Sequence, residues 1–300
     1  MAFSFRWSAR LWPSVVENGG MSINAIAPTD TRAFFRPVVH HLVDLLRRLP
    51  ADAWDRPTTA GAWRVRDIVA HLLDTSLRRL SFQRDRHTLP PPHPISSEAD
   101  FVRFINTLNA EWISASRRIS GPVMTSLYAA AGEELAEFFE RLPLDAPALF
   151  PVSWAGDDGD VGWLDIGREL TEQWHHQMQI RDAVGAAPLP DPAWHRAVLL
   201  IAIRGLPHAY RGVAAASGTA VVVEIVGAAG GTFSLRRDGS RWHIFSGDAG
   251  DASARAILSD DSAWRLLFNG LAGDEMSTRV QVHGDADLVT PLLAARSVVV

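Results

Sequence analysis

The chain has 300 residues, of which 47% are hydrophobic and 21% are charged, with a net charge of −5 and no cysteine. Its length exceeds the usual single-domain size of about 100–200 residues, so we expect two domains. The composition is that of a globular protein and excludes a disordered chain. The lack of cysteine excludes disulfides, thiolate metal ligands and a cysteine nucleophile.

All 29 basic residues are arginines, and they occur as scattered pairs balanced by acidic residues. Because no basic tract or basic face results, we expect no nucleic-acid partner. The longest apolar run, residues 197–203, is far shorter than the ~20 residues of a membrane-spanning helix, so we expect no membrane partner. Arg6 and Arg10 interrupt the apolar residues near the start, which is unlike a signal peptide and predicts a cytoplasmic location.

Residues 1–28 precede the first helix signals and are predicted to be an N-terminal extension, of which residues 1–20 have little structure. Thr29 and Asp30 can cap a first helix, whose apolar residues recur at helical spacing until Pro50. Apolar residues at helical spacing recur in several further segments up to residue 187. Further helices are predicted at residues 63–86, 98–119, 123–142 and 165–185, with a Pro-rich loop at 89–94 and a glycine-rich loop at 154–163.

Gly185 lies where the C-cap of the last of these helices is expected. Helices joined by short connections predict an antiparallel bundle over residues 29–187, in which sites are built from side chains that face one another across the core. The composition changes at residues 186–194, which contain three prolines and form the predicted domain boundary.

Beyond a helix at residues 194–210, the apolar period changes from 3.6 to 2, which predicts strands. A hairpin turn is expected at Asp238-Gly239. Asp260 or Asp261 is expected to cap a later helix. The predicted strands are residues 219–226, 232–238, 241–247, 254–259 and 278–284, and the predicted helices are 262–270 and 285–295. This order predicts a compact α+β domain over residues 191–300.

Glu172 lies four residues before His176 in the helix predicted at 165–185. Residues at this spacing project side by side from a helix, so both side chains can reach one cation. Asp165 and Gln179 extend the same polar stripe. A Glu and a His at this spacing are, by themselves, more typical of a surface ion pair. His175 lies about 100° around the helix from His176 and is expected to point elsewhere.

His71 lies at the edge of the apolar stripe of the helix predicted at 63–86. There its ring can point into the bundle, and Asp67, one turn earlier, can orient its second nitrogen. Such a histidine, taken by itself, is typical of half-buried structure. Together, His71, Glu172 and His176 supply three ligands and leave one position open, as in a catalytic zinc site. Nickel, iron or manganese can bind the same set, and the spacing does not choose between them.

Two stretches, GAWRVRDIVAHLLD at 61–74 and RELTEQWHHQMQIRDAVG at 168–185, resemble the metal-binding domain of the mycothiol-dependent maleylpyruvate isomerases, part of the DinB-like superfamily. Residues 191–300 are similar to the sterol-carrier-protein-like domain that follows in that family. The resemblance implies an N-terminal all-α DinB-like four-helix bundle and a C-terminal α+β sterol-carrier-protein-like domain. It also implies a divalent metal, usually zinc, bound by His71, Glu172 and His176.

The same resemblance implies that a small thiol such as mycothiol takes the open metal position, where the cation lowers the pKa of the thiol. The chain departs from the family pattern, because the first acidic residue after His176 is Asp182 and Gln179 resembles a position of the broader superfamily, which includes thiol S-transferases. We therefore expect an enzyme, a thiol-dependent cis-trans isomerase or an S-transferase, that acts on a small activated alkene or electrophile.

The alternative is a non-catalytic metal-binding, ligand-binding or regulatory protein, since a shared fold does not imply a shared function. The partners expected for the enzyme are a small-molecule substrate and a small thiol, with the chain a monomer or a homodimer. Asp67 and Gln179 are candidates for supporting the metal ligands. Arg204, Arg211 and Arg236 of the second domain are candidates for binding substrate, although none matches a family residue.

Overall fold

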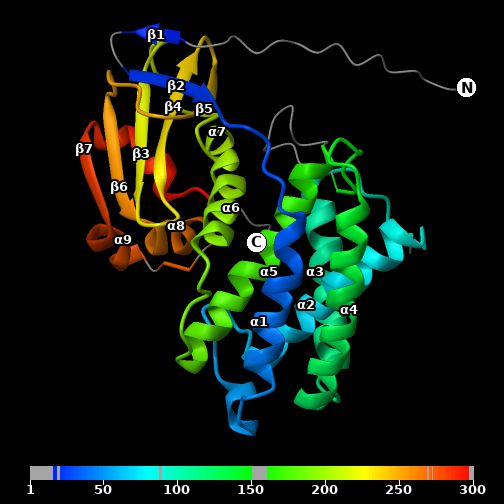
Figure 1. Ribbon diagram of the computed structural model, residues 1–300. Coiled ribbons are helices and arrows are strands. Elements are labelled where there is room, and N and C mark those ends of the chain that lie inside the picture. Colours follow the sequence, from blue (N-terminus) through cyan, green and yellow to red (C-terminus); the bar gives the residue numbers. More distant parts are fainter. Residues whose placement is uncertain are drawn as a thin grey trace, which may run out of the picture.

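The computed structural model describes residues 16–18, 21–87, 90–150, 161–268, 270–271 and 273–296. A helical N-terminal part is followed by a C-terminal part built on a mixed sheet (Figure 1). Most of the loop predicted at 154–163 lies outside the described residues, as do most of residues 1–20. No helix in the described ranges combines the length and apolar character needed to cross a bilayer.

The predicted helices of the first part are confirmed, with small changes at their ends. They are α1 (Phe35–Leu46), α2 (Val65–Arg79), α3 (Glu98–Ser116), α4 (Gly121–Arg141) and α5 (Gly162–Val184). A short 3-10 turn, η1 (Arg32–Phe34), precedes α1, and the Asp30 carboxylate accepts the N–H of Arg32 and does not cap α1. Gly185 ends α5 with a positive φ of 70°, as expected for a C-cap glycine.

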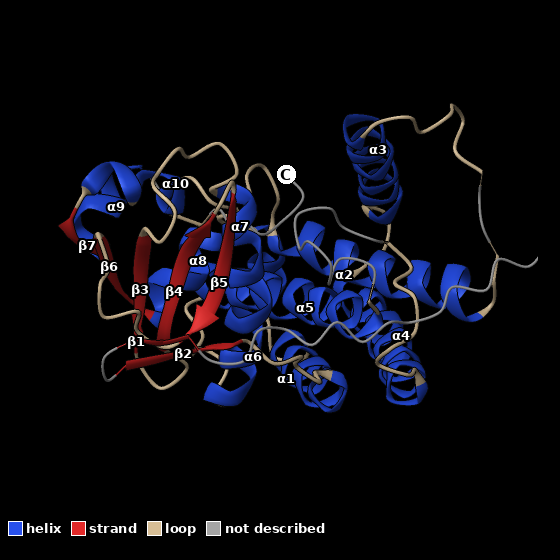
Figure 2. Ribbon diagram, turned by 90° about the horizontal axis from the view of Figure 1, so that it is seen from above, coloured by secondary structure: helices blue, strands red, loops and turns tan. Residues whose placement is uncertain are grey.

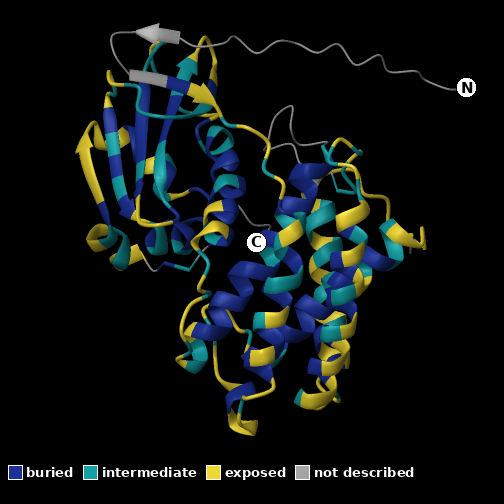
Figure 3. Cartoon of the chain, viewed as in Figure 1, coloured by how far each residue is buried: buried dark blue, intermediate teal, exposed yellow. Residues whose placement is uncertain are grey.

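Helix α5 lies at the centre of the molecule. It packs against α1, α2 and α6 (Pro192–Ala202), and most of it is buried (Figure 3). The close approach to α6 depends on Gly167, where a methyl group would lie 2.5 Å from Cδ1 of Ile201. The polar stripe of α5 therefore faces the interior, unlike the stripe of a surface ion pair.

Helix α3 is placed differently from the other helices of the first part. It packs mainly against α2, and Figure 2 shows it set apart from α1, α4 and α5. Ser97 caps its first turn by accepting the N–H of Asp100 at 3.1 Å. The side of α3 that faces α5 is therefore available to line a cavity.

The C-terminal part contains a seven-stranded sheet with the order β1-β2-β5-β4-β3-β6-β7. Its strands are β1 (Val16–Asn18), β2 (Met21–Ala25), β3 (Ala220–Val226), β4 (Gly231–Asp238), β5 (Arg241–Ser246), β6 (Ala254–Ser259) and β7 (Val280–Gly284). Strands β3 and β6 pair in parallel, and the other neighbours pair antiparallel. The predicted hairpin is confirmed, with Asp238 paired to Arg241 and Gly239 at a φ of 53°.

Strands β1 and β2 fall inside the predicted N-terminal extension and were missed by the sequence analysis. Strand β2 pairs with β5, so that Ala25 lies opposite Phe245. The buried guanidinium of Arg204 holds the segment after β2 by donating to the carbonyl oxygens of Ile26 and Ala27 at 3.0 and 2.8 Å. Because the pairing partner is more than two hundred residues away in the chain, no local pattern indicates this arrangement.

The remaining helices are η5 (Ile203–Gly205), α7 (Leu206–Ala209), α8 (Asp260–Leu267), α9 (Gly273–Arg279), η6 (Ala286–Leu288) and α10 (Thr290–Leu293). They include one, α9, that was not predicted, and the helix predicted at 194–210 is divided into α6, η5 and α7. The cap of α8 is Ser259, whose hydroxyl accepts the N–H of Ser262 at 3.1 Å, so the expected caps Asp260 and Asp261 lie in the first turn. Helix α9 takes the first residues of the predicted strand, and β7 begins at Val280.

Candidate metal centre

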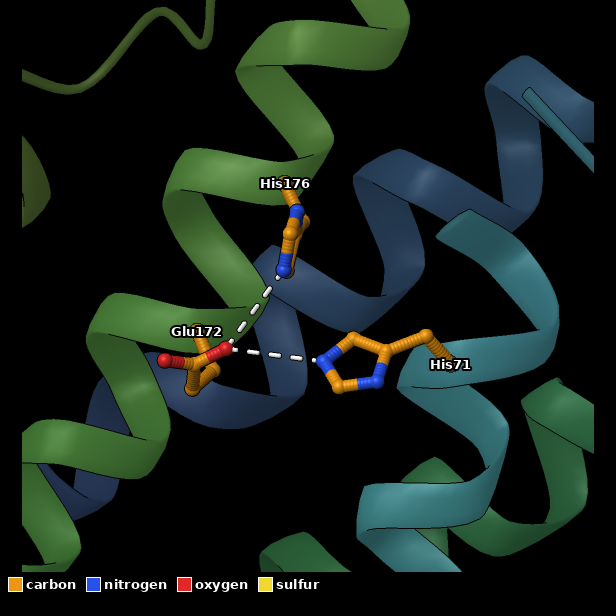
Figure 4. Close-up of side chains that lie close together, drawn as sticks. All are labelled: His71, Glu172 and His176. Carbon is orange, nitrogen blue, oxygen red and sulfur yellow. Dashed lines mark ion pairs between the residues drawn. The ribbon is translucent and has the colours of Figure 1, made fainter. Parts of the chain in front are cut away.

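His71 from α2 and Glu172 and His176 from α5 meet in the interior (Figure 4). Oε2 of Glu172 lies 3.6 Å from Nε2 of His71 and 3.5 Å from Nε2 of His176. All three ligand atoms lie within 4.8 Å of one another. The structure therefore brings together the three residues predicted to bind one cation.

The spacing of Glu172 Oε2 from each of the two imidazole nitrogens fits a shared metal ion. Two ligands at the Zn–N and Zn–O distances of about 2.0–2.2 Å, in tetrahedral arrangement, lie about 3.3–3.5 Å apart. The separations of 3.5 and 3.6 Å are within a few tenths of an ångström of this distance. Two imidazole nitrogens and one carboxylate oxygen form a donor set that zinc, nickel, iron and manganese accept.

Burial and hydrogen bonding set the protonation of these ligands. Burial lowers the pKa of His71 to about 4. Burial alone raises the pKa of Glu172, but the close contacts with the His176 and His71 imidazoles outweigh it and hold that pKa well below its usual value. At neutral pH, His71 is therefore neutral and Glu172 ionised, which are the protonation states that metal ligands require.

His176 is oriented by Gln179. Nδ1 of His176 lies 2.7 Å from Oε1 of Gln179, and both side chains are buried. With its proton on Nδ1 and donated to Gln179, the imidazole presents the lone pair of Nε2 towards Glu172. Gln179, a candidate for supporting the metal ligands, therefore lies in contact with one of them, His176.

Asp67 does not support His71, contrary to the expectation. Its Oδ2 accepts the N–H of Arg64 at 3.0 Å, because Asp67 is the third residue of α2 and closes a capping box there. Nδ1 of His71 is buried and has no hydrogen-bond partner among the residues that the structure describes. The ring instead packs on Trp63, with ring centroids 4.9 Å apart.

His175 supplies none of the three ligand atoms but, contrary to the expectation, its ring lies beside the site, with its centroid 4.0 Å from that of His176. Its Nδ1 lies 2.7 Å from the carbonyl oxygen of Thr171, and its ring stacks on Phe268 at 4.7 Å between centroids. Burial lowers the pKa of His175 to about 3.

We expect the metal-free chain to lose stability as the pH falls from about 7 to about 4. The pKa values of His71 and His175 are both depressed from the usual 6.5, so the unfolded chain binds more protons than the folded chain over this range. The contribution of these two histidines to the free energy of unfolding is complete above pH 6.5. It is lost as the pH falls through their pKa values in the folded chain. Urea denaturation after treatment with a chelator, at a series of pH values, measures this change.

Replacing His175 by phenylalanine keeps the stack on Phe268 and should flatten this pH dependence. Replacing the exposed His40 by alanine should leave it unchanged. A free energy of unfolding that stays constant or rises over the same pH range would contradict the expectation.

The three ligands border a cavity of about 560 Å³. Its walls come from the loop before α2, from α2, α3 and α5, and from two phenylalanines, Phe150 and Phe268. A volume of this size is typical of small-molecule sites, which range over about 300–1,000 Å³. The open coordination position therefore has room for a ligand beside it.

The second-domain arginines proposed for substrate do not border this cavity. Arg204 holds the segment after β2 and lies over the ring of Trp163. Arg211 donates to the carbonyl oxygen of His208 at 2.8 Å, and Arg236 pairs with Asp251 at 3.4 Å on the sheet. These three side chains therefore make contacts away from the cavity.

Three arginines of the helical part border the cavity instead: Arg78, Arg79 and Arg168. Arg79 forms a buried ion pair with Asp165, with N···O distances of 2.7 and 2.8 Å, and a further contact of 2.8 Å with Glu169. The sequence analysis missed them. For Arg168, the helical spacing could have indicated its position at the cavity, because it precedes Glu172 by four residues and lies on the same face of α5.

Residues 35–181 match the protein family described as the mycothiol maleylpyruvate isomerase N-terminal domain. Crystal structures of the mycothiol-dependent maleylpyruvate isomerase and of a histidine-to-alanine mutant are each similar to this chain, with a TM-score of 0.50 and 11% identity over 84% of this chain and 90% of the other. At this identity the likeness shows the fold. No curated protein matches the chain significantly. Residues 35–181 therefore belong to the mycothiol maleylpyruvate isomerase N-terminal domain family.

Proposed function

We propose that the chain is a divalent-metal-binding, thiol-dependent enzyme that acts on a small activated alkene or electrophile, either as a cis-trans isomerase or as an S-transferase. The observation that carries the proposal is the meeting of His71, Glu172 and His176 at the edge of the cavity. Family membership supports the thiol, since the matching family and the two similar structures carry mycothiol in their names.

The proposed metal is zinc, held by the Nε2 atoms of His71 and His176 and a carboxylate oxygen of Glu172. A divalent cation bound there supplies a positive charge that lowers the pKa of a coordinated thiol. Gln179 holds the proton on Nδ1 of His176, so that Nε2 remains free to bind. Trp63, which packs on both imidazole rings at 4.9 and 5.9 Å, shields this side of the site from water.

The finer fold assignment is part of the same proposal. Helices α1, α2, α4 and α5 would form a DinB-like four-helix bundle within residues 29–187, and residues 191–300 a sterol-carrier-protein-like domain. The mutual contacts of these four helices and the mixed sheet are consistent with this assignment. In this arrangement two helices of the bundle supply all the ligands.

Removal and return of the metal tests the function. The chain as purified should contain about one divalent metal per molecule by elemental analysis, as expected for a single three-ligand site. In the presence of mycothiol, it should isomerise a small activated cis-alkene or transfer mycothiol to an electrophile. A chelator should abolish either activity, and zinc should restore it. A metal-loaded chain that performs neither reaction would favour the non-catalytic alternative.

A further inference from the structure

One wall of the cavity comes mainly from α3 and is apolar except for Asn106 and Asn109. Phe101, Ile105 and Ile113 lie on the side of this helix that borders the cavity. Phe150 continues the wall, with its ring centroid 6.0 Å from that of Phe101. Since α3 packs mainly against α2, this apolar surface faces the cavity and not another helix.

The cationic side chains around the cavity are already matched by carboxylates. Arg78 lies 3.1 Å from Asp74. Arg79 contacts both Asp165 and Glu169. Arg168 lies 3.8 Å from Asp165 and donates to the carbonyl oxygen of Phe150 at 3.1 Å. Three arginines are thus balanced by three carboxylates.

Glu172 is the remaining charged ligand, with its Oε2 3.6 Å from Nε2 of His71 and 3.5 Å from Nε2 of His176. A divalent cation with Glu172 and one thiolate is formally neutral. A ligand with two negative charges would therefore enter a buried, neutral site without a counter-charge, and the desolvation of unpaired charges is costly. An apolar group would gain free energy by covering the wall of α3.

We infer that the electrophile accepted by this cavity has an apolar body of about the size of an aromatic ring and at most one negative charge, in contrast to a small dicarboxylate. The inference rests on the proposed function, because the metal centre identifies the end of the cavity where the substrate reacts. The apolar body lies against Phe101, Ile105 and Phe150, and the activated double bond points towards Glu172 and the two histidines.

Two activated alkenes test this preference: benzylideneacetone, which is neutral and aromatic, and maleate, a small dianion. Isothermal titration calorimetry is done on the metal-loaded full chain, saturated with a small thiol that fills the open metal position. The dissociation constant for benzylideneacetone should be at least about tenfold below that for maleate, because the burial of a phenyl ring contributes more free energy than a tenfold change in affinity requires. Equal affinities, or tighter binding of maleate, would overturn the inference.

A pair of variants locates the binding wall. Ile105→Asp places a negative charge in the cavity, whereas Thr107→Asp places the same charge on the exposed side of α3. The first should weaken benzylideneacetone binding at least about tenfold, and the second should leave it unchanged. Ile105→Asn, which is neutral, is the second variant should Ile105→Asp fail to fold. Unaltered binding in a folded Ile105 variant would contradict the inference.

Elemental analysis of the same samples separates this inference from the proposed function. A chain without metal and without thiol-dependent activity would overturn the proposed function. The affinities of benzylideneacetone and maleate for the metal-free cavity would still test the inference. A metal-containing, active chain that prefers maleate would overturn only the substrate class.

Discussion

The variant Glu172→Gln should lower the affinity of the chain for zinc by at least about a hundredfold, since even residues that only support metal ligands contribute about 10–100-fold. The Glu172 carboxylate is the one anionic ligand of the set, and its Oε2 lies within 3.6 Å of both imidazole Nε2 atoms. An amide keeps the size of this side chain but removes its charge. Titration with zinc in competition with a chelator of known affinity measures the loss.

Glu133→Gln is the matched control for this variant. Glu133 also contacts a histidine, His40, but both lie on the surface, so zinc affinity should not change. His71→Ala and His176→Ala should reproduce the loss seen with Glu172→Gln, although they lie on different helices. Zinc affinity equal to wild type in any of these three variants would refute the metal centre.

A smaller loss, of about 10–100-fold, is expected for Gln179→Ala, which removes the hydrogen-bond partner of His176 Nδ1. Gln179→Glu should retain the affinity, because a carboxylate also accepts that hydrogen bond. Rescue by the second variant distinguishes the positioning of His176 from a general loss of packing.

The variant Arg79→Met should destabilise the chain by about 3–5 kcal/mol, the cost of leaving a buried charge without its partner. The Arg79 and Asp165 side chains are 3% and 2% exposed, and Glu169 also depends on this guanidinium. Methionine fills much of the space but leaves Glu169 without its ion-pair partner and Asp165 with only the longer contact of 3.8 Å to Arg168. Urea denaturation followed by circular dichroism measures the free energy of unfolding.

Arg84→Met is the control, because Arg84 pairs with Asp85 and Glu134 at the surface with 38% of its side chain exposed. Its effect should remain within about 1 kcal/mol, as for other exposed ion pairs. The Arg79 pair also joins α2 to α5, which between them supply all three metal ligands, so Arg79→Met should weaken zinc binding as well. Wild-type stability of Arg79→Met would show that the pair contributes little.

Much of this organisation was predictable, because local periodicity determines it. Apolar residues at helical spacing placed the helices of the first part to within a few residues, and the alternation from Ala220 to Ser246 placed three strands and their hairpin. Residues four apart on a helix share a face, which put Glu172 beside His176. His71 was added from its place at the edge of an apolar stripe, together with a family resemblance.

The wrong predictions for individual residues have a common origin: a polar side chain can choose between several hydrogen-bonding partners. Asp67 was expected to orient His71, one turn further along α2. Its carboxylate instead accepts the backbone N–H of Arg64, which has no partner within the helix because it precedes the first turn of α2. Arg204 was expected in a substrate site, and it instead satisfies two backbone carbonyls after β2. Which partner a polar side chain takes depends on groups that local sequence does not reveal.

The sequence by itself determined the type and approximate extent of the main elements and the pair of ligands on α5, because these depend on residues within two turns of one another. Only the tertiary structure decided that the stripe of α5 is buried, that β2 joins the C-terminal sheet, and that α3 and α5 enclose a cavity whose arginines are matched by carboxylates. Those features arise from packing between segments far apart in the chain, and no local pattern encodes which surfaces will meet.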